Sequence, residues 1–75
     1  MRTENELLKE LKELGFKYDG LFVTEEEFET IEMMEEVISC EYVGYRNGGA
    51  GEYTYHIRLE NDPEDVIRSV YIIEE

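Results

Sequence analysis

The segment TEEEFETIEMMEEVISCEYVGY, residues 24–45, contains a change in hydrophobic period. In its first half, apolar residues such as Phe28 and Ile31 recur at the spacing of one helix face. In its second half, Ile38, Cys40 and Tyr42 recur at every second position, which is typical of a half-buried strand. The segment therefore predicts a helix over residues 25–36, followed by a strand that begins at residue 37.

The starts of two helices are marked by capping boxes. Thr24 is followed three residues later by Glu27, so that each side chain can accept a hydrogen bond from the other's backbone N–H. Thr3 and Glu6 repeat this spacing at the start of an apolar stripe within residues 3–14. The stripe consists of Leu7, Leu8, Leu11 and Leu14. The first half of the chain therefore predicts two helices.

Two further strands are expected in the second half. Alternation over residues 53–59 and β-branched residues over 67–73 predict them, and the glycine-rich residues 47–51 predict a hairpin loop. Residues 20–23 fit either a short extra strand or an apolar lead into the second helix. We therefore expect a single α+β domain over residues 1–75. Its two N-terminal helices pack on a small three-stranded antiparallel sheet, in the order helix, helix, strand, strand, strand.

Length and composition limit what the domain can contain. Of the 75 residues, 41% are apolar, which suits one core but not a core plus a deep cofactor cavity, so no cofactor is expected. Cys40 is the single cysteine, which excludes an intramolecular disulfide and fits a reducing compartment. The N-terminal MRTENELLKELKEL lacks the apolar stretch of a signal peptide, and no segment predicts a membrane span. A cytoplasmic location is therefore expected.

No motif predicts catalysis or metal binding. With one Cys and one His, the chain lacks the members of a zinc site or of a Cys/His nucleophile pair, and His56 is expected to be an ordinary surface residue. Asp62 and the acidic residues after it lack the spacing of a calcium loop. General acid/base work needs a carboxyl with a raised pKa in a pocket, whereas the glutamates are expected on a solvated face. We expect no enzyme, no catalytic residues and no metal ligands.

The charge is large and unevenly distributed. Twenty carboxylates against seven Lys and Arg give a formal net charge of −13, and residues 1–17 sum to zero, so the whole excess lies beyond residue 17. Between Tyr18 and Tyr45 there is no Lys or Arg. Such a charge disfavours nucleic acid and anionic membranes as partners, and it favours basic proteins or multivalent cations.

Glutamates dominate the second predicted helix. At about 100° per residue, four of them fall within an arc of about 60° away from the apolar face: Glu25, Glu29, Glu32 and Glu36. Like charges at this spacing destabilise a helix by roughly 0.2–0.5 kcal/mol per pair, and only first-turn carboxylates gain from the helix dipole. Seven glutamates over residues 25–36 give about one carboxylate per 2.6 Å, between the charge spacings of duplex and single-stranded DNA. The array predicts a binding surface for a basic partner.

Two other residues are candidates for contact with that partner. Met33 is predicted near the edge of the glutamate face, where an apolar anchor within an acidic rim would add binding energy; the alternative is packing at the helix border. Tyr45, at the hairpin end, is available to a partner, whereas Tyr53 and Tyr55 are expected to face the core. The predicted partner-binding set is Glu25, Glu29, Glu32, Met33, Glu36 and Tyr45.

The small size, the lack of catalytic residues and the acidic stretch from Tyr18 to Tyr45 resemble the small acidic inhibitors of bacteriophages and mobile elements. These include anti-CRISPR, anti-restriction and other DNA-mimic proteins. The resemblance lies in overall character and implies a non-enzymatic inhibitor that binds a basic nucleic-acid-binding protein or enzyme, such as a CRISPR effector, with carboxylates in place of phosphates and no direct binding of nucleic acid. Two alternatives stay open: an acidic adaptor or antitoxin-like protein that binds a basic protein without DNA mimicry, and a domain whose charge serves solubility.

Overall fold

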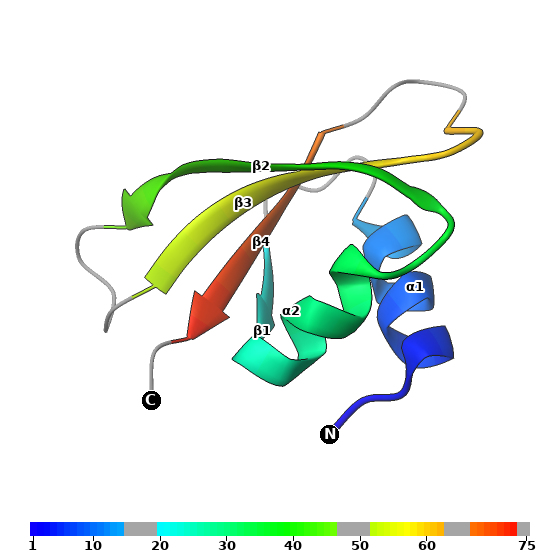
Figure 1. The fold of residues 1–75 in the computed structure, drawn as a ribbon, viewed down its shortest axis with the longest axis horizontal. Coiled ribbons are helices and arrows are strands. Elements are labelled where there is room, and N and C mark those ends of the chain that lie inside the picture. Colours follow the sequence, from blue (N-terminus) through cyan, green and yellow to red (C-terminus); the bar gives the residue numbers. More distant parts are fainter. Residues whose placement is uncertain (15–19, 47–51, 63–66, 74–75) are drawn as a thin grey trace.

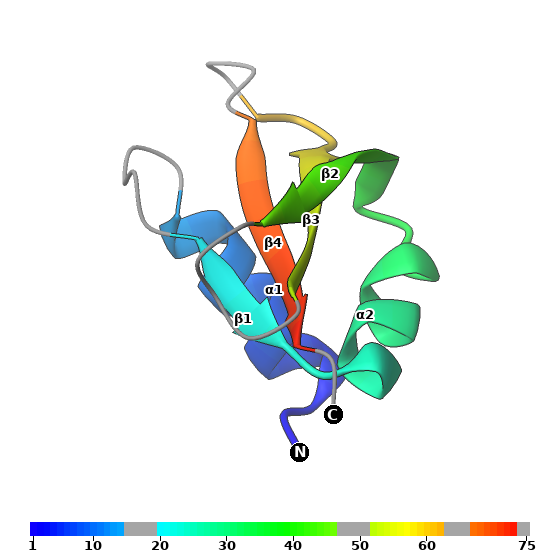
Figure 2. The same cartoon turned by 90° about the vertical axis from the view of Figure 1, so that its left-hand side faces the viewer.

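The computed structural model describes residues 1–14, 20–46, 52–62 and 67–73. Its elements in chain order are α1 (Glu4–Glu13), β1 (Leu21–Val23), α2 (Glu25–Glu32), β2 (Val37–Arg46), β3 (Glu52–Leu59) and β4 (Arg68–Ile73). The four strands form one sheet, and the two helices pack on one of its faces (Figure 1, Figure 2). The α+β class and the two N-terminal helices agree with the prediction.

The predicted three-stranded antiparallel sheet is wrong. The sheet has four strands in the order β1-β4-β3-β2, and β1 pairs parallel to β4 whereas the other pairs are antiparallel. The apolar residues before α2 therefore form a strand, in which Leu21 lies opposite Val70 and Val23 opposite Ile72. Parallel pairing is possible here because α2 and the β2–β3 hairpin lie between the two strands in sequence, which gives the chain room to cross over. The added strand covers an edge that β4 would otherwise expose.

One hydrophobic core lies between the helices and the sheet. Its buried side chains come from both helices, from β1, β3 and β4, and from the turn after α2: Leu7, Leu11, Val23, Phe28, Ile31, Met34, Ile57, Leu59 and Val70. Leu8 and Leu14 of the predicted stripe pack against this cluster and are partly buried. A core of this size gives only modest stability, so single polar contacts at its border carry weight.

Both predicted capping boxes are present. The Thr3 hydroxyl accepts a hydrogen bond from the Glu6 backbone N–H, and the Glu6 carboxylate accepts one from the Thr3 N–H. Thr24 and Glu27 repeat this arrangement at the start of α2, with distances of 3.2 Å and 2.9 Å. The caps were predictable because they depend on residues only three positions apart.

The predicted end of the second helix is wrong, because α2 stops at Glu32 and not at residue 36. The last turn holds no basic residue, so glutamates there oppose the helix dipole instead of complementing it. Met34 is buried after the helix ends, and its carbonyl accepts a hydrogen bond from the Val37 N–H at the start of β2. The helix therefore ends one helical turn earlier than the periodicity predicts, whereas β2 begins at Val37 as predicted, and Glu36 lies in the turn between them.

Two irregularities change the faces of β2. The register shifts between Val37 and Ser39, so Val37 and Cys40 pack against the core whereas Ile38 is 61% exposed. The simple alternation through Ile38 is thus interrupted by a bulge. A second shift, between Tyr42 and Gly44, places Gly44 at φ 142°, a backbone conformation that suits glycine.

Gly20 lies directly against the ring of Tyr71, so a Cβ at this position would overlap ring carbons. Gly20→Ala should push the Tyr71 ring away from Phe22, whose ring centroid is 5.0 Å away. We expect a loss of about 1 kcal/mol, the typical worth of an aromatic pair, measured as the change in free energy of unfolding in urea. Adding Tyr71→Leu should make the alanine harmless. A full loss that persists in the double variant would contradict this account.

Candidate functional site

Exposed carboxylates dominate the surface of α2. Five of its eight residues are glutamates, and all but Glu27 are exposed. Glu25, Glu29 and Glu32 follow one another at spacings of four and three residues, so they lie along one side of the helix; we call these three the acidic row. The four exposed glutamates of α2, Glu26 included, average about one carboxylate per 3 Å of helix, close to the 3.4 Å charge spacing of a single DNA strand, whereas the acidic row alone averages about one per 5 Å.

The structure shows no ion pair between the acidic row and a cation of the described residues. Within the described residues, Glu25, Glu29 and Glu32 form no ion pair. Arg2 is the cation that reaches α2, and its guanidinium is held by Glu27 at 2.9 Å and by Glu10 at 2.8 Å. Among the described residues, the row is therefore exposed and has no cation paired with it.

Glu27 differs from the other glutamates of α2 because its side chain is buried and its carboxylate accepts several hydrogen bonds. Its carboxylate accepts hydrogen bonds from the Arg2 side chain, from the Arg2 backbone N–H at 3.0 Å and from the Thr24 N–H. The hydrogen bond from Arg2 is the main cause that lowers the pKa of Glu27 to about 2. Glu27 is thus a structural residue that ties the N-terminus to α2, and it is no part of the exposed face.

Of the other predicted contact residues, Met33 and Glu36 lie around the end of α2, whereas Tyr45 lies near the far end of β2. Met33 is the C-cap residue of α2 and is 85% exposed, so it does not pack at the helix border. Glu36 lies in the following turn and is partly buried, and its carbonyl accepts a hydrogen bond of 2.6 Å from the Glu60 N–H. Tyr45 belongs to β2 and pairs with Tyr53, while its predicted side-chain role lies outside the described part of the structure. The acidic row and Met33, which directly follows α2, therefore stay together, and Glu36 is displaced from them.

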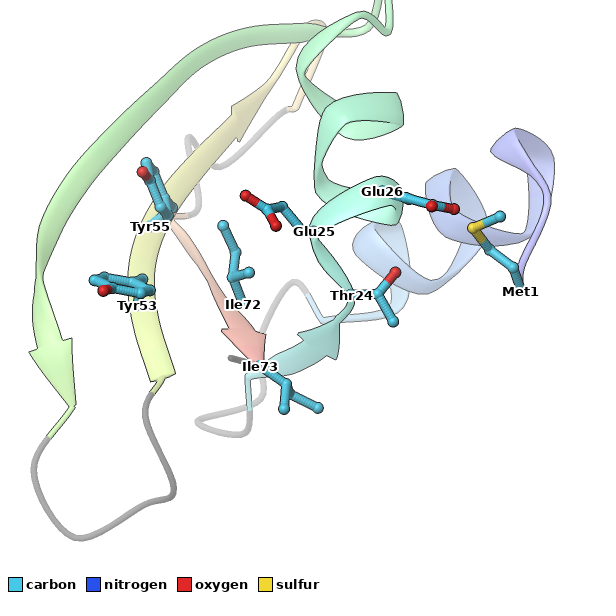
Figure 3. A pocket seen from close by; sticks show the side chains of 8 residues that line it. All are labelled: Met1, Thr24, Glu25, Glu26, Tyr53, Tyr55, Ile72 and Ile73. Atoms are coloured by element: carbon cyan, nitrogen blue, oxygen red, sulfur yellow. The ribbon is translucent and has the colours of Figure 1, made fainter. Parts of the chain in front are cut away.

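A groove of about 820 Å³ lies between the start of α2 and the sheet. Figure 3 shows Glu25 pointing from α2 toward Tyr55 and Ile72, whereas Glu26 points to the other side, toward Met1. Tyr53 and Tyr55 stand beside each other on β3, across the groove from the helix (Figure 3). The described residues that line it are Met1, Thr24, Glu25, Glu26, Tyr53, Tyr55, Ile72 and Ile73.

The two tyrosines that line this groove are part of a row of aromatic rings. Tyr55 is 4.4 Å from the buried Phe28 of α2 and 5.4 Å from Tyr42 of β2, measured between ring centroids. Tyr42 is also 6.4 Å from Tyr53. Tyr42 is 52% exposed and Tyr53 is 37% exposed, so the row runs from the core out to solvent. The groove therefore has an acidic wall and an aromatic floor.

Sequence reasoning did not include these tyrosines in the site. It placed Tyr53 and Tyr55 on the core side of the sheet, and they do lie on the same face as Ile57 and Leu59. However, α2 is short and covers only part of that face, so the tyrosines nearer the start of β3 line a groove and are not enclosed. The signal in the sequence is the concentration of tyrosines in two neighbouring strands, with Tyr42 and Tyr45 in β2 and Tyr53 and Tyr55 in β3.

The described side chains with potential chemistry are few. His56 is partly buried on β3, opposite Glu41 and Ser69 in the neighbouring strands. Burial, and to a smaller extent the charge of Glu32, raises the pKa of the Cys40 thiol, which disfavours the reactive thiolate. Among the described residues, no three His, Cys, Asp or Glu side chains come together as a metal site. The arrangement is suited to binding through charge and aromatic surface.

No helix in the described ranges is both long enough and apolar enough to span a membrane. Comparison with models of protein families, with curated proteins and with solved structures gives no match for this chain.

Proposed function

We propose that this protein is a non-enzymatic inhibitor that binds a basic nucleic-acid-binding protein or enzyme, of the kind that a CRISPR effector represents. The carboxylates of the acidic row take the place of DNA phosphates in the partner's binding channel. The observation that carries the proposal is an exposed row of three glutamates with no ion pair among the described residues, in a stretch of sequence without Lys or Arg.

The energetics of α2 support a binding role for the row. Three like charges at helical spacing lower the stability of the helix, whereas lysines between them would raise it. Arg2 does not neutralise the acidic row, because its guanidinium is bound to Glu10 and Glu27. A basic partner would remove this repulsion on binding. The field of a strongly acidic protein would also steer the encounter, so association should be fast and should weaken with salt.

Met33 supplies the apolar part of this surface. It directly follows α2, one residue after the last glutamate of the acidic row, and it is 85% exposed. An apolar side chain that becomes buried at the centre of an interface contributes energy that surface charges rarely give. We therefore place Met33 in the contact with the partner, beside Glu32.

An acidic adaptor or antitoxin-like protein is the second candidate function. The observation that favours it is the exposed apolar surface around the turn after α2, where Met33 is followed by Ile38 at 61% exposure. DNA has no counterpart of these exposed apolar side chains, so imitation of DNA does not account for them. Such an adaptor would bind a basic protein outside its nucleic-acid site.

The acidic row can be tested by replacing Glu25, Glu29 and Glu32 together with glutamine. We expect at least a tenfold loss in affinity for the partner captured from a nuclease-treated bacterial lysate at physiological salt, because three charge pairs are removed. A matched control replaces the exposed Glu13, Glu41 and Glu60 with glutamine, which removes the same number of charges elsewhere. Equal weakening by both triple variants would show that net charge alone governs binding and would contradict the proposal.

A further inference from the structure

The groove beside α2 differs from the rest of the acidic surface because its negative charge faces aromatic rings. Glu25, the first member of the acidic row, points into it, while Tyr53 and Tyr55 line the opposite side (Figure 3). The remaining row residues, Glu29 and Glu32, continue along the helix away from this end. The groove is therefore the place where the charged surface and the tyrosines meet.

The chemistry of the lining selects one kind of occupant. A phosphate or a carboxylate would be repelled by Glu25 and Glu26, and a purely apolar group would bury the Glu25 carboxylate without a partner, at a cost in desolvation. A cation satisfies both the carboxylate and the negative faces of the tyrosine rings. Among cations, the planar guanidinium can stack on an aromatic ring while it donates paired hydrogen bonds to a carboxylate, which an ammonium cannot do.

We propose that the groove receives an arginine side chain of the partner, with its guanidinium stacked on Tyr53 and Tyr55 and hydrogen-bonded to Glu25. This inference rests on the proposed function and names the group that the partner contributes. The volume of about 820 Å³ exceeds one side chain, so the groove also admits the backbone on either side of the arginine. The acidic row attracts any basic surface, whereas the groove fixes the position of one arginine.

The inference can be tested with short blocked peptides that do not depend on the natural partner. The probe is acetyl-Gly-Arg-Gly-Arg-Gly-amide, and the controls carry lysine or the uncharged citrulline in place of arginine. Titrations are followed through the ring signals of the tyrosines in NMR spectra. We expect the Tyr53 and Tyr55 signals to shift on addition of the arginine peptide, at least threefold weaker binding of the lysine peptide, and no shift with citrulline.

Variants separate stacking from charge attraction. Tyr53→Leu should weaken binding of the arginine peptide about threefold or more, and Tyr53→Phe should retain it, because the ring is what the guanidinium contacts. Tyr71→Leu serves as the control, since Tyr71 lies on the opposite face of the sheet from its buried neighbour Val70. Equal binding of arginine and lysine peptides, or tyrosine signals that do not move, would overturn the inference.

The outcome for the groove is distinguishable from the outcome for the proposed function. If the glutamine triple variant loses the lysate partner while Tyr53→Leu keeps both partner and peptide, the acidic row stands and the arginine site is refuted. If the arginine peptide shifts the tyrosines but no lysate protein depends on the acidic row, the arginine site stands and the inhibitor function is refuted.

Discussion

Replacing Glu27 with glutamine is expected to lower the free energy of unfolding by about 3 kcal/mol at pH 7. The carboxylate is buried, and it joins the capping box of α2 to both the guanidinium and the backbone of Arg2. Glutamine has nearly the same shape but carries no charge, and its amide group offers a donor where Arg2 needs an acceptor. The drop in the pKa of Glu27 from 4.5 to about 2 corresponds to a contribution of this size.

The loss of stability caused by Glu27→Gln is expected to depend on pH. Because the pKa of Glu27 is lower in the folded state than in the unfolded chain, its contribution is fully present above pH about 4.5 and is lost as the pH falls toward 2. Urea unfolding of the wild type and of Glu27→Gln should therefore differ strongly at pH 7 and weakly at pH 2. The exposed Glu29→Gln is the control and should not destabilise the protein at pH 7. A difference for Glu27→Gln that stays constant over this range would refute the assignment.

Arg68→Met should lower the free energy of unfolding by about 3 kcal/mol as well. Arg68 lies in the core-facing row of β4 with only 6% exposure, and its side chain pairs with Asp62 at 2.7 Å and donates to the Leu11 carbonyl near the end of α1. Methionine fills similar space but leaves a largely buried carboxylate without its cation, which typically costs 3–5 kcal/mol. For a domain of this size the melting temperature should fall by roughly 15 °C.

Two comparisons isolate the ion pair from the loss of packing. Lys9→Met, on the exposed side of α1, should leave the melting temperature almost unchanged. Asp62→Leu combined with Arg68→Met should lose less than the sum of the single changes, because the double variant removes both charges of the pair. If the two losses simply add, the pair is not coupled and this explanation is incorrect.

The fold was predictable where it depends on neighbours in sequence. The capping boxes at Thr3 and Thr24 follow from residues three positions apart, and the alternation of β3 follows from its own side chains. Local sequence does not decide whether β1 forms, because only three residues make it up and its partner strand begins 47 residues after it starts. The strand order and the parallel pair depend on that distant contact, which local periodicity does not contain.

The site was predictable to a similar degree. The acidic row follows from helical spacing, but the end of α2 is set by the burial of Met34 and by the lack of a cation near the helix C-terminus, so Glu36 lies off the helix. The ion pair of Arg2 with Glu27 joins residues 25 positions apart and removes one glutamate from the exposed face. The groove depends on how much of the sheet α2 leaves uncovered, which a sequence pattern does not specify.

The most direct measurement of the central claim is competition by duplex DNA for the captured partner. The immobilised protein, loaded with partner from a nuclease-treated lysate, is washed with increasing duplex DNA at constant salt. If the carboxylates of α2 occupy the partner's nucleic-acid site, the fraction of partner released should rise with the fraction of that site filled by DNA. The glutamine triple variant should release the partner at lower DNA concentrations than the wild type does. A partner that binds DNA and the immobilised protein at the same time, without displacement at saturating DNA, would contradict mimicry and favour the adaptor.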